Sequence, residues 1–199
     1  QTAAFCFTAA EAELNAADAR LGDGDTGGML KRLADGVGKV DLSSTDDLGV
    51  AFMELAKAAS ASTGSSLGTL VMTALMSLSK ATRGETKLPA ERFPEFLSDI
   101  CAAMLARGGA ALGDKTVIDG LQAVAEALST ARPADYAVVA DRAAKEALDS
   151  FRDRPNRIGR ARVYGDKSRG LDDPGMLALS KLCAAFAGNV QAREAAKEG

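Results

Sequence analysis

The chain of 199 residues contains no histidine and no tryptophan, and aromatic residues make up only 5% of it. Without an imidazole it cannot use histidine as a general base, so a Ser–His–Asp triad is excluded. Cys6, Cys101 and Cys183 are odd in number and far apart, which disfavours a zinc site and a disulfide framework. Each lies beside Ala or another apolar residue. We therefore expect small core side chains in a reducing cytoplasm.

Long apolar runs and an excess of positive charge are also lacking. No stretch approaches the roughly 18 apolar residues of a membrane span. The net charge of -3 gives no overall basic surface, so neither a membrane nor a nucleic acid is an expected partner. The chain begins at Gln1 rather than at an initiator Met, so we expect missing or processed residues before it. Residues 1–7 lack the charged start of a signal peptide, and we expect a cytoplasmic protein.

Helical periodicity dominates what is present. The apolar content of 47% is carried mainly by Ala, Leu and Met, which favours packed helices over a sheet. We expect the first helix to start at a capping box of Thr8 and Glu11, the second near Gly28, and the third with Ser44 or Thr45 as its N-cap. Apolar periodicity continues over residues 70–78, 96–105, 117–128, 136–151 and after Pro174. With no strand pattern and no linker, residues 1–199 are expected to form a single all-α domain, an antiparallel up-and-down bundle of about eight helices.

One stretch between the first two expected helices carries three carboxylates among glycines. Asp18, Asp23 and Asp25 offer oxygen ligands of the kind that Mg²⁺ prefers, with phosphate and water completing the octahedron. A helix start near Gly28 would present free N–H groups to a phosphate. An EF-hand is excluded because Ala34 would occupy its twelfth position, where a bidentate Glu is required. The stretch therefore predicts a metal–phosphate site, and an ordinary solvated turn is the alternative.

Two further loops contain small residues that suit phosphate. Residues 62–64 could bind it through hydroxyl and backbone N–H groups, or could simply be a helix N-terminus. The loop from Gly108 to Thr116 resembles a P-loop, but Asp114 separates the last glycine from Lys115 and a helix precedes it. A Walker A motif is therefore not expected. A phosphate loop of another kind and plain helix C-cap glycines both remain open.

The segment from Arg152 to Gly175 has no helical periodicity and is rich in Arg, Asp and Gly. Long irregular segments in compact domains are usually functional or disordered. Its arginines have no evident partners within it, which favours a flap, mobile when empty, that uses Arg160 to neutralise phosphate. A solvated loop is the alternative. Alternate loops of an up-and-down bundle lie at the same end, so we expect all four stretches to gather around one ligand.

Five motifs in one order resemble the L subunit, the nucleotide-binding domain, of dihydroxyacetone kinases. The resemblance spans nearly the whole chain, and the order is more specific than any single motif. The motifs are Asp18-x-x-x-x-Asp23-Gly24-Asp25-x-Gly27, Ser62-Thr63-Gly64 leading to Leu67-Gly68-Thr69, Gly108-Gly109-x-x-x-Gly113-Asp114-Lys115-Thr116-x-Ile118-Asp119, Gly159-Arg160-Ala161-x-x-Tyr164-Gly165 and Asp172-Asp173-Pro174-Gly175.

The resemblance implies an eight-helix antiparallel barrel that binds ATP or ADP with two Mg²⁺ ions at one end. It implies Asp18, Asp23 and Asp25 as metal ligands and Arg160 as a catalytic cation. The nucleotide-binding positions that it implies are Thr26, Gly27, Gly28, Met29, Ser62, Thr63, Gly64, Gly108, Val117, Arg160, Asp173, Pro174 and Gly175.

The family also implies partners. Its ketose is held by a separate K subunit or domain through a covalent bond to a histidine, which this chain cannot supply. Phosphotransferase-dependent members add an M subunit that rephosphorylates bound nucleotide. Thr26 stands where the family frequently has His, Thr63 where Ser is common, Val117 where Met is common and Arg162 where Ser is common. Leu171 and Asp172 stand where the family often has His-Gln. These departures leave open the substrate and the choice between ATP and bound ADP.

The predicted function is that of a nucleotide- and Mg²⁺-binding kinase subunit. It delivers the γ-phosphoryl group to a short ketose such as dihydroxyacetone, held by a K-type subunit. Two alternatives are a kinase subunit for another small sugar and a nucleotide-dependent regulatory module that docks a transcription factor.

Overall fold

The computed structural model describes residues 1–198, which form eight α-helices and three 3-10 segments with no strand among them. The all-α prediction is confirmed. The 3-10 segments are η1 (Ala90–Arg92), η2 (Pro133–Asp135) and η3 (Arg160–Ser168). The helices are α1 (Thr2–Asp18), α2 (Thr26–Gly38), α3 (Leu48–Ser62), α4 (Ser66–Ala81), α5 (Phe93–Gly108), α6 (Val117–Ser129), α7 (Tyr136–Phe151) and α8 (Pro174–Glu198).

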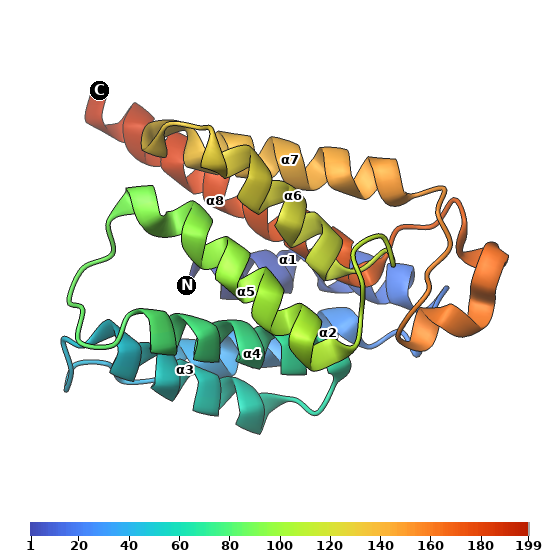
Figure 1. The fold of residues 1–199 in the computed structure, drawn as a ribbon, viewed down its shortest axis with the longest axis horizontal. Helices are drawn as coiled ribbons and strands as arrows, with labels where there is room; N and C mark the ends of the chain where they lie inside the picture. Colours follow the sequence, from blue (N-terminus) through green and yellow to red (C-terminus); the bar gives the residue numbers. More distant parts are fainter. Residues whose placement is uncertain (199) are drawn as a thin grey trace.

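The helices form a closed up-and-down barrel. Each helix packs against the next in sequence, and α8 packs against α1 to complete the ring. The connections after α1, α3, α5 and α7 lie together at one end, on the right of Figure 1, and the remaining connections lie at the other end. The predicted gathering of the glycine-containing loops at one end is therefore confirmed.

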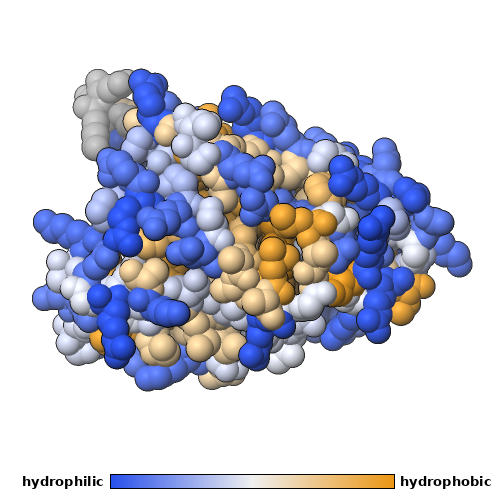
Figure 2. Space-filling model, viewed as in Figure 1, coloured by the Kyte–Doolittle hydropathy of each residue, from blue (hydrophilic) through white to orange (hydrophobic). Residues whose placement is uncertain are grey.

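The interior is built mainly from aliphatic residues and alanines, and Phe7 and Phe96 are also buried in it. One cluster includes Leu14 and Met176 from α1 and α8, and a second includes Ile118 and Leu128 from α6. Charged side chains cover much of the outside, and Figure 2 shows an apolar area over the region of α5 and α6. Within residues 1–198 no helix combines the length and the apolar character that crossing a membrane requires.

The three cysteines are free thiols within this core. Cys6 and Cys101 are buried and Cys183 is partly buried. Burial raises the pKa of Cys101 to about 11 and that of Cys183 to about 12, so neither is a thiolate at neutral pH. The expectation of small core side chains is confirmed.

Two predicted helix starts are wrong. Helix α1 begins at Thr2, and Thr8 lies inside it, because the burial of Cys6 and Phe7 against the core carries the helix through this position. The predicted capping box of Thr8 and Glu11 therefore does not start a helix.

The N-cap of α3 also differs from the prediction. It is Asp47, whose carboxylate accepts hydrogen bonds from the N–H groups of Gly49 (2.7 Å) and Val50 (3.2 Å). Ser44 and Thr45 precede it in the turn. A carboxylate is a strong N-cap acceptor, so Asp47 caps the helix in place of the two predicted hydroxyl residues.

Helices α1 and α2 approach closely at Gly27. A Cβ atom there would lie 2.3 Å from the carbonyl oxygen of Glu11 and 2.9 Å from Oδ1 of Asn15. Since the first of these is backbone, only a shift of a whole helix could make room for a side chain. Gly27 therefore sets the spacing of the two helices that flank the Asp/Gly stretch.

We expect Gly27→Ala to lower the free energy of unfolding by about 2 kcal/mol, because overpacking forces the backbones apart. Gly38→Ala is the matched control, since it lies in the same helix and a Cβ there meets nothing within 4 Å. The control should be neutral or stabilising by up to about 1 kcal/mol. Urea unfolding followed by circular dichroism measures both, and equal stability of the two variants would contradict the close packing.

Candidate functional site

A cleft of about 400 Å³ opens at the end of the barrel where the four connections meet. All four contribute to its wall. The predicted site residues that line it are Asp18, Asp23, Asp25, Thr26, Met29, Gly108, Val117, Arg160, Asp173, Pro174 and Gly175. The predicted residues that lie outside its lining are Gly27, Gly28, Ser62, Thr63 and Gly64.

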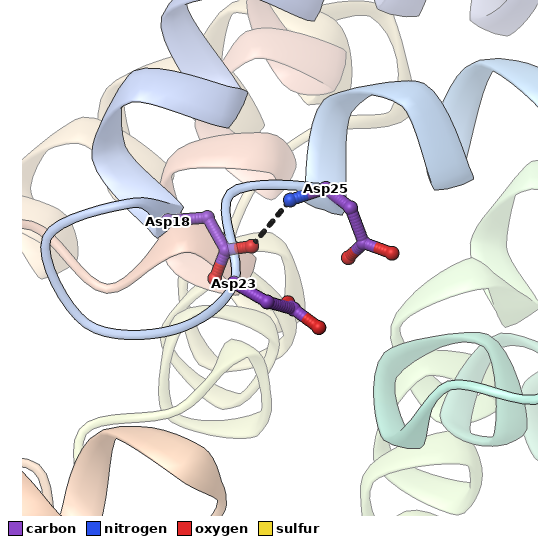
Figure 3. A group of neighbouring side chains, drawn as sticks. All are labelled: Asp18, Asp23 and Asp25. Carbon is purple, nitrogen blue, oxygen red and sulfur yellow. Dashed lines mark hydrogen bonds between the residues drawn. The ribbon is translucent and has the colours of Figure 1, made fainter.

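The three aspartates of the first connection converge on this cleft. Asp18, Asp23 and Asp25 each offer a carboxylate oxygen, and these oxygens lie within 4.8 Å of one another. Asp18 is buried, whereas Asp23 and Asp25 are exposed, and Figure 3 shows their carboxylates close together beside the loop. Such a set of oxygen donors fits a hard cation such as Mg²⁺.

The carboxylate of Asp18 is held in place by hydrogen bonds from the backbone at the start of α2, and these bonds also order that backbone. Its Oδ2 accepts the N–H groups of Asp25 (2.9 Å) and Thr26 (3.2 Å), and the first of these bonds is drawn in Figure 3. A Cβ on Gly22 would lie 2.6 Å from Oδ1 of Asp18, so glycine at this position leaves room around that oxygen. One carboxylate oxygen thus stabilises the loop, and the other remains available to a ligand.

Asn15 is a structural residue that the sequence analysis missed. Its Oδ1 accepts the N–H groups of Gly27 (2.7 Å) and Gly28 (3.2 Å). Together with Asp18 it satisfies the N–H groups at the start of α2, so the prediction that this start offers them to a phosphate is wrong. The spacing of Asn15 and Asp18, one helical turn apart on α1, could have indicated their shared role.

The loop between α3 and α4 faces the cleft with later residues than expected. Ser62 ends α3 and donates to the carbonyl of Ala58 (2.7 Å), and Thr63 bonds Ser65 within the turn. Ser65 and Ser66 line the cleft instead, and Ser65 is the N-cap of α4. The alternative of a small-residue helix N-terminus therefore describes this loop locally.

The loop between α5 and α6 combines a helix end with a helix start. Gly109 caps α5 in the left-handed conformation, at φ 64°. Thr116 begins α6 with a capping box that it shares with Asp119. Lys115 is 1% exposed and is not part of the cleft wall. The resemblance to a phosphate-binding P-loop thus does not extend to the position of its lysine.

The long connection between α7 and α8 is more ordered than its sequence indicates. It contains η3, two short turns joined by a kink at Gly165. Arg152 pairs with Asp172 at 2.7 Å and Arg169 with Asp166 at 2.8 Å, so the expectation that its arginines lack partners within the segment is wrong. Arg152 and Asp172 are 20 residues apart, so no local sequence pattern indicates that they pair.

The tip of this connection reaches across the cleft to the aspartates. Arg160 forms an ion pair with Asp23, and both side chains are more than half exposed. Desolvation alone would raise the pKa of Asp23. The hydrogen bond and the charge of Arg160 lower the pKa by more than this, so it lies below its usual value. A cation from the last connection therefore lies beside an acidic group from the first.

Asp173 is held at the start of α8 by two donors. It accepts the N–H of Met176 (3.0 Å) and the side-chain amide of Asn156 (2.9 Å). Desolvation outweighs these bonds and the charge of Lys115, and it raises the pKa of Asp173 to about 6. Asp173 is nevertheless partly exposed as a residue, and it lines the cleft.

The family known as the DAK2 domain matches residues 20–188 of this sequence. The chain belongs to that family. It is 34% identical over 189 residues to L-erythrulose 1-kinase of Mycolicibacterium smegmatis, a match that covers 88% of this chain and 32% of the relative. It is 27% identical over 175 residues to the Escherichia coli "PEP-dependent dihydroxyacetone kinase, ADP-binding subunit DhaL", covering 85% and 83% of the two chains.

Solved structures agree with this DAK2 assignment. The chain resembles the dihydroxyacetone kinase of C. freundii in its native form with a TM-score of 0.75 and 25% identity, covering 94% of this chain and 33% of that one. The same kinase in complex with AMP-PNP and Mg²⁺ gives a TM-score of 0.72 and 26% identity, covering 95% and 32%. The resemblance inferred from the motifs is confirmed. The chain spans about a third of the length of these kinases and of the mycobacterial relative.

We expect Asp25→Asn to abolish Mg²⁺-dependent binding of ADP without changing the melting temperature, because the side chain is exposed and caps nothing. The control is Asp35→Asn, which removes the same charge from an exposed position of α2 outside the cleft. Calorimetric titration with ADP and Mg²⁺ measures both. Unchanged affinity in Asp25→Asn would rule out this carboxylate as a ligand.

We expect the stability of the wild type, relative to that of Asp173→Asn, to fall by roughly 1–2 kcal/mol between about pH 4 and about pH 8. The folded pKa of about 6 lies above the unfolded value, so protonated Asp173 costs nothing at low pH and stability is lost as pH rises through the folded pKa. Asparagine does not titrate, so the variant lacks this loss, whatever the cost of placing its amide beside the donors of Met176 and Asn156. Urea unfolding across this range tests it, with exposed Asp153→Asn as the control. A stability difference independent of pH would contradict the assignment.

Proposed function

We propose that this DAK2 domain binds ATP or ADP with Mg²⁺ and delivers a phosphoryl group to a short ketose held by a K-type subunit or domain. The observation that carries the proposal is the convergence of three carboxylates on a cleft that all four connections line. The C. freundii kinase that it resembles is described in complex with AMP-PNP and Mg²⁺, which supports the ligand class.

The chain's own residues divide the work of binding. Asp18, Asp23 and Asp25 would hold Mg²⁺, and we extend the proposal to two ions as the family resemblance implies. Held by these carboxylates, Mg²⁺ would supply positive charge that offsets the charge of the phosphates. Arg160 contributes a further positive charge where negative charge builds up on the transferred group, and it is the catalytic residue of the proposal.

The remaining cleft residues suit the other parts of a nucleotide. The hydroxyl-bearing residues Ser65 and Ser66 lie on the wall and suit phosphate oxygens. Met29, Leu70 and Ile118 provide apolar surface for the base. Thr26, Gly108, Val117 and the Asp173–Gly175 turn complete the proposed nucleotide site.

The proposal places the acceptor on a separate K-type subunit or domain. No histidine exists in the sequence to hold a ketose covalently, as the K subunits of the family do. The E. coli relative is named as PEP-dependent and ADP-binding, which supports a mode with an M-type phosphocarrier. The mycobacterial kinases share the higher identity, 34% in both cases, and their names support erythrulose as a second candidate acceptor.

We expect the purified chain to bind ADP–Mg²⁺ but to form no sugar phosphate from ATP and dihydroxyacetone or erythrulose. Turnover should begin when a K-type partner is added, because that partner supplies the held ketose. A coupled assay of ADP release, run with each ketose, measures this and identifies the preferred acceptor. Turnover by the chain alone, or the absence of ADP–Mg²⁺ binding, would contradict the proposal.

A further inference from the structure

Lys115 is a buried cation that the proposed nucleotide site does not use. It lies two residues after Gly113, takes a positive φ of 63°, and is 1% exposed and outside the cleft lining. Burial lowers the pKa of its ammonium, while the charges of Asp173 and Asp172 act in the opposite direction. A buried lysine without partners would be costly, so its contacts indicate what keeps it there.

The ammonium group joins both ends of the connection between α7 and α8. Its Nζ donates to the carbonyl oxygens of Arg152 (2.9 Å), Arg154 (2.9 Å) and Ser168 (3.0 Å). The first two acceptors begin the connection and the third ends η3. We call residues 152–156 and 168–173 the stem of this connection. All three N–H donors of the ammonium are therefore used to hold the two sides of the stem together.

Asn156 extends this network to the start of α8. Its backbone N–H donates to Oγ of Ser168 (2.8 Å), and its side-chain amide donates to the carbonyl of Lys115 (3.0 Å) and to Asp173 (2.9 Å). Asn156 is 3% exposed and Ser168 is fully buried. The stem is thus fixed from within, and the same atoms locate Asp173 at the cleft.

The part of the connection beyond this stem carries the cleft residues. Residues 158–161 line the cleft, and Arg160 pairs with Asp23. Farther along the tip, Val163 is 79% exposed. Within the tip, residues 157–167, Ala161 is the one buried residue, so the tip has few packing contacts of its own to hold Arg160 in place.

We propose that Lys115 is a positioning residue, which places Arg160 and Asp173 at the nucleotide site by closing the stem of the α7–α8 connection. This inference rests on the proposed function. It assigns to the lysine of the third motif a role in holding the protein's own backbone, and none in contacting phosphate.

The test uses Lys115→Met, which keeps side-chain length and removes the donors. We expect the affinity for ADP–Mg²⁺ to fall about tenfold, or about 1.4 kcal/mol. Amide exchange across residues 157–167 should accelerate about tenfold, because three carbonyls lose their donor. Binding of Mn²⁺ without nucleotide, followed by electron paramagnetic resonance, should be retained or increased, since the three aspartates lie on another connection.

A control separates positioning from general loss of stability. Leu128→Ala empties a buried position near the far end of α6 and should lower the melting temperature without altering exchange at residues 157–167. If Lys115→Met does not fold, Ser168→Ala is the milder test, since it removes the bonds to Asn156 and Gly165 and should shift affinity and exchange in the same direction.

Unchanged exchange and affinity in Lys115→Met would overturn the inference, and so would the same changes in Leu128→Ala. Failure of the wild-type chain to bind ADP–Mg²⁺ would instead overturn the proposed function. The exchange comparison would then still decide whether Lys115 holds the stem.

Discussion

The hydrogen bonds that Oδ2 of Asp18 accepts from Asp25 and Thr26 are the contact on which the site depends. They turn the chain from α1 into α2 within a few residues, and in doing so they bring Asp23 and Asp25 beside Asp18. Gly22 and Gly27 permit this turn, one beside the carboxylate and the other between the helices. The arrangement of three like charges is therefore maintained by backbone donors, which also offset the cost of burying Asp18.

The barrel topology decides what can join these aspartates. Alternate connections of an up-and-down ring share one end, so residues from four separate parts of the sequence form one cleft without long excursions from any of the first three. Only the last connection is long, and it alone crosses from its own helices to the acidic loop, where Arg160 meets Asp23. The rigid helices thus position the binding residues, and one longer segment completes the enclosure.

Periodic and compositional signals predicted the helices, their up-and-down order and the cluster of aspartates, because each of these depends on residues close in sequence. The signals failed where tertiary contacts decide. Burial of Cys6 and Phe7 makes α1 begin earlier than the predicted capping box, and Asp47 is the N-cap of α3 in place of Ser44 or Thr45. The roles of Asn15, Asn156 and Lys115 depend on partners 12 to 53 residues away, which no local pattern reveals.

An even number of antiparallel helices has a geometric consequence for any longer polypeptide that contains this barrel. Helix α1 runs toward the cleft and α8 runs away from it, so both termini lie at the end opposite the cleft. A ketose-bearing domain of the kind proposed would have to face the cleft, whereas a covalent link to it would leave from the other end. Helix α8 has 25 residues and is about 37 Å long, so such a link needs about eleven extended residues to pass alongside the barrel.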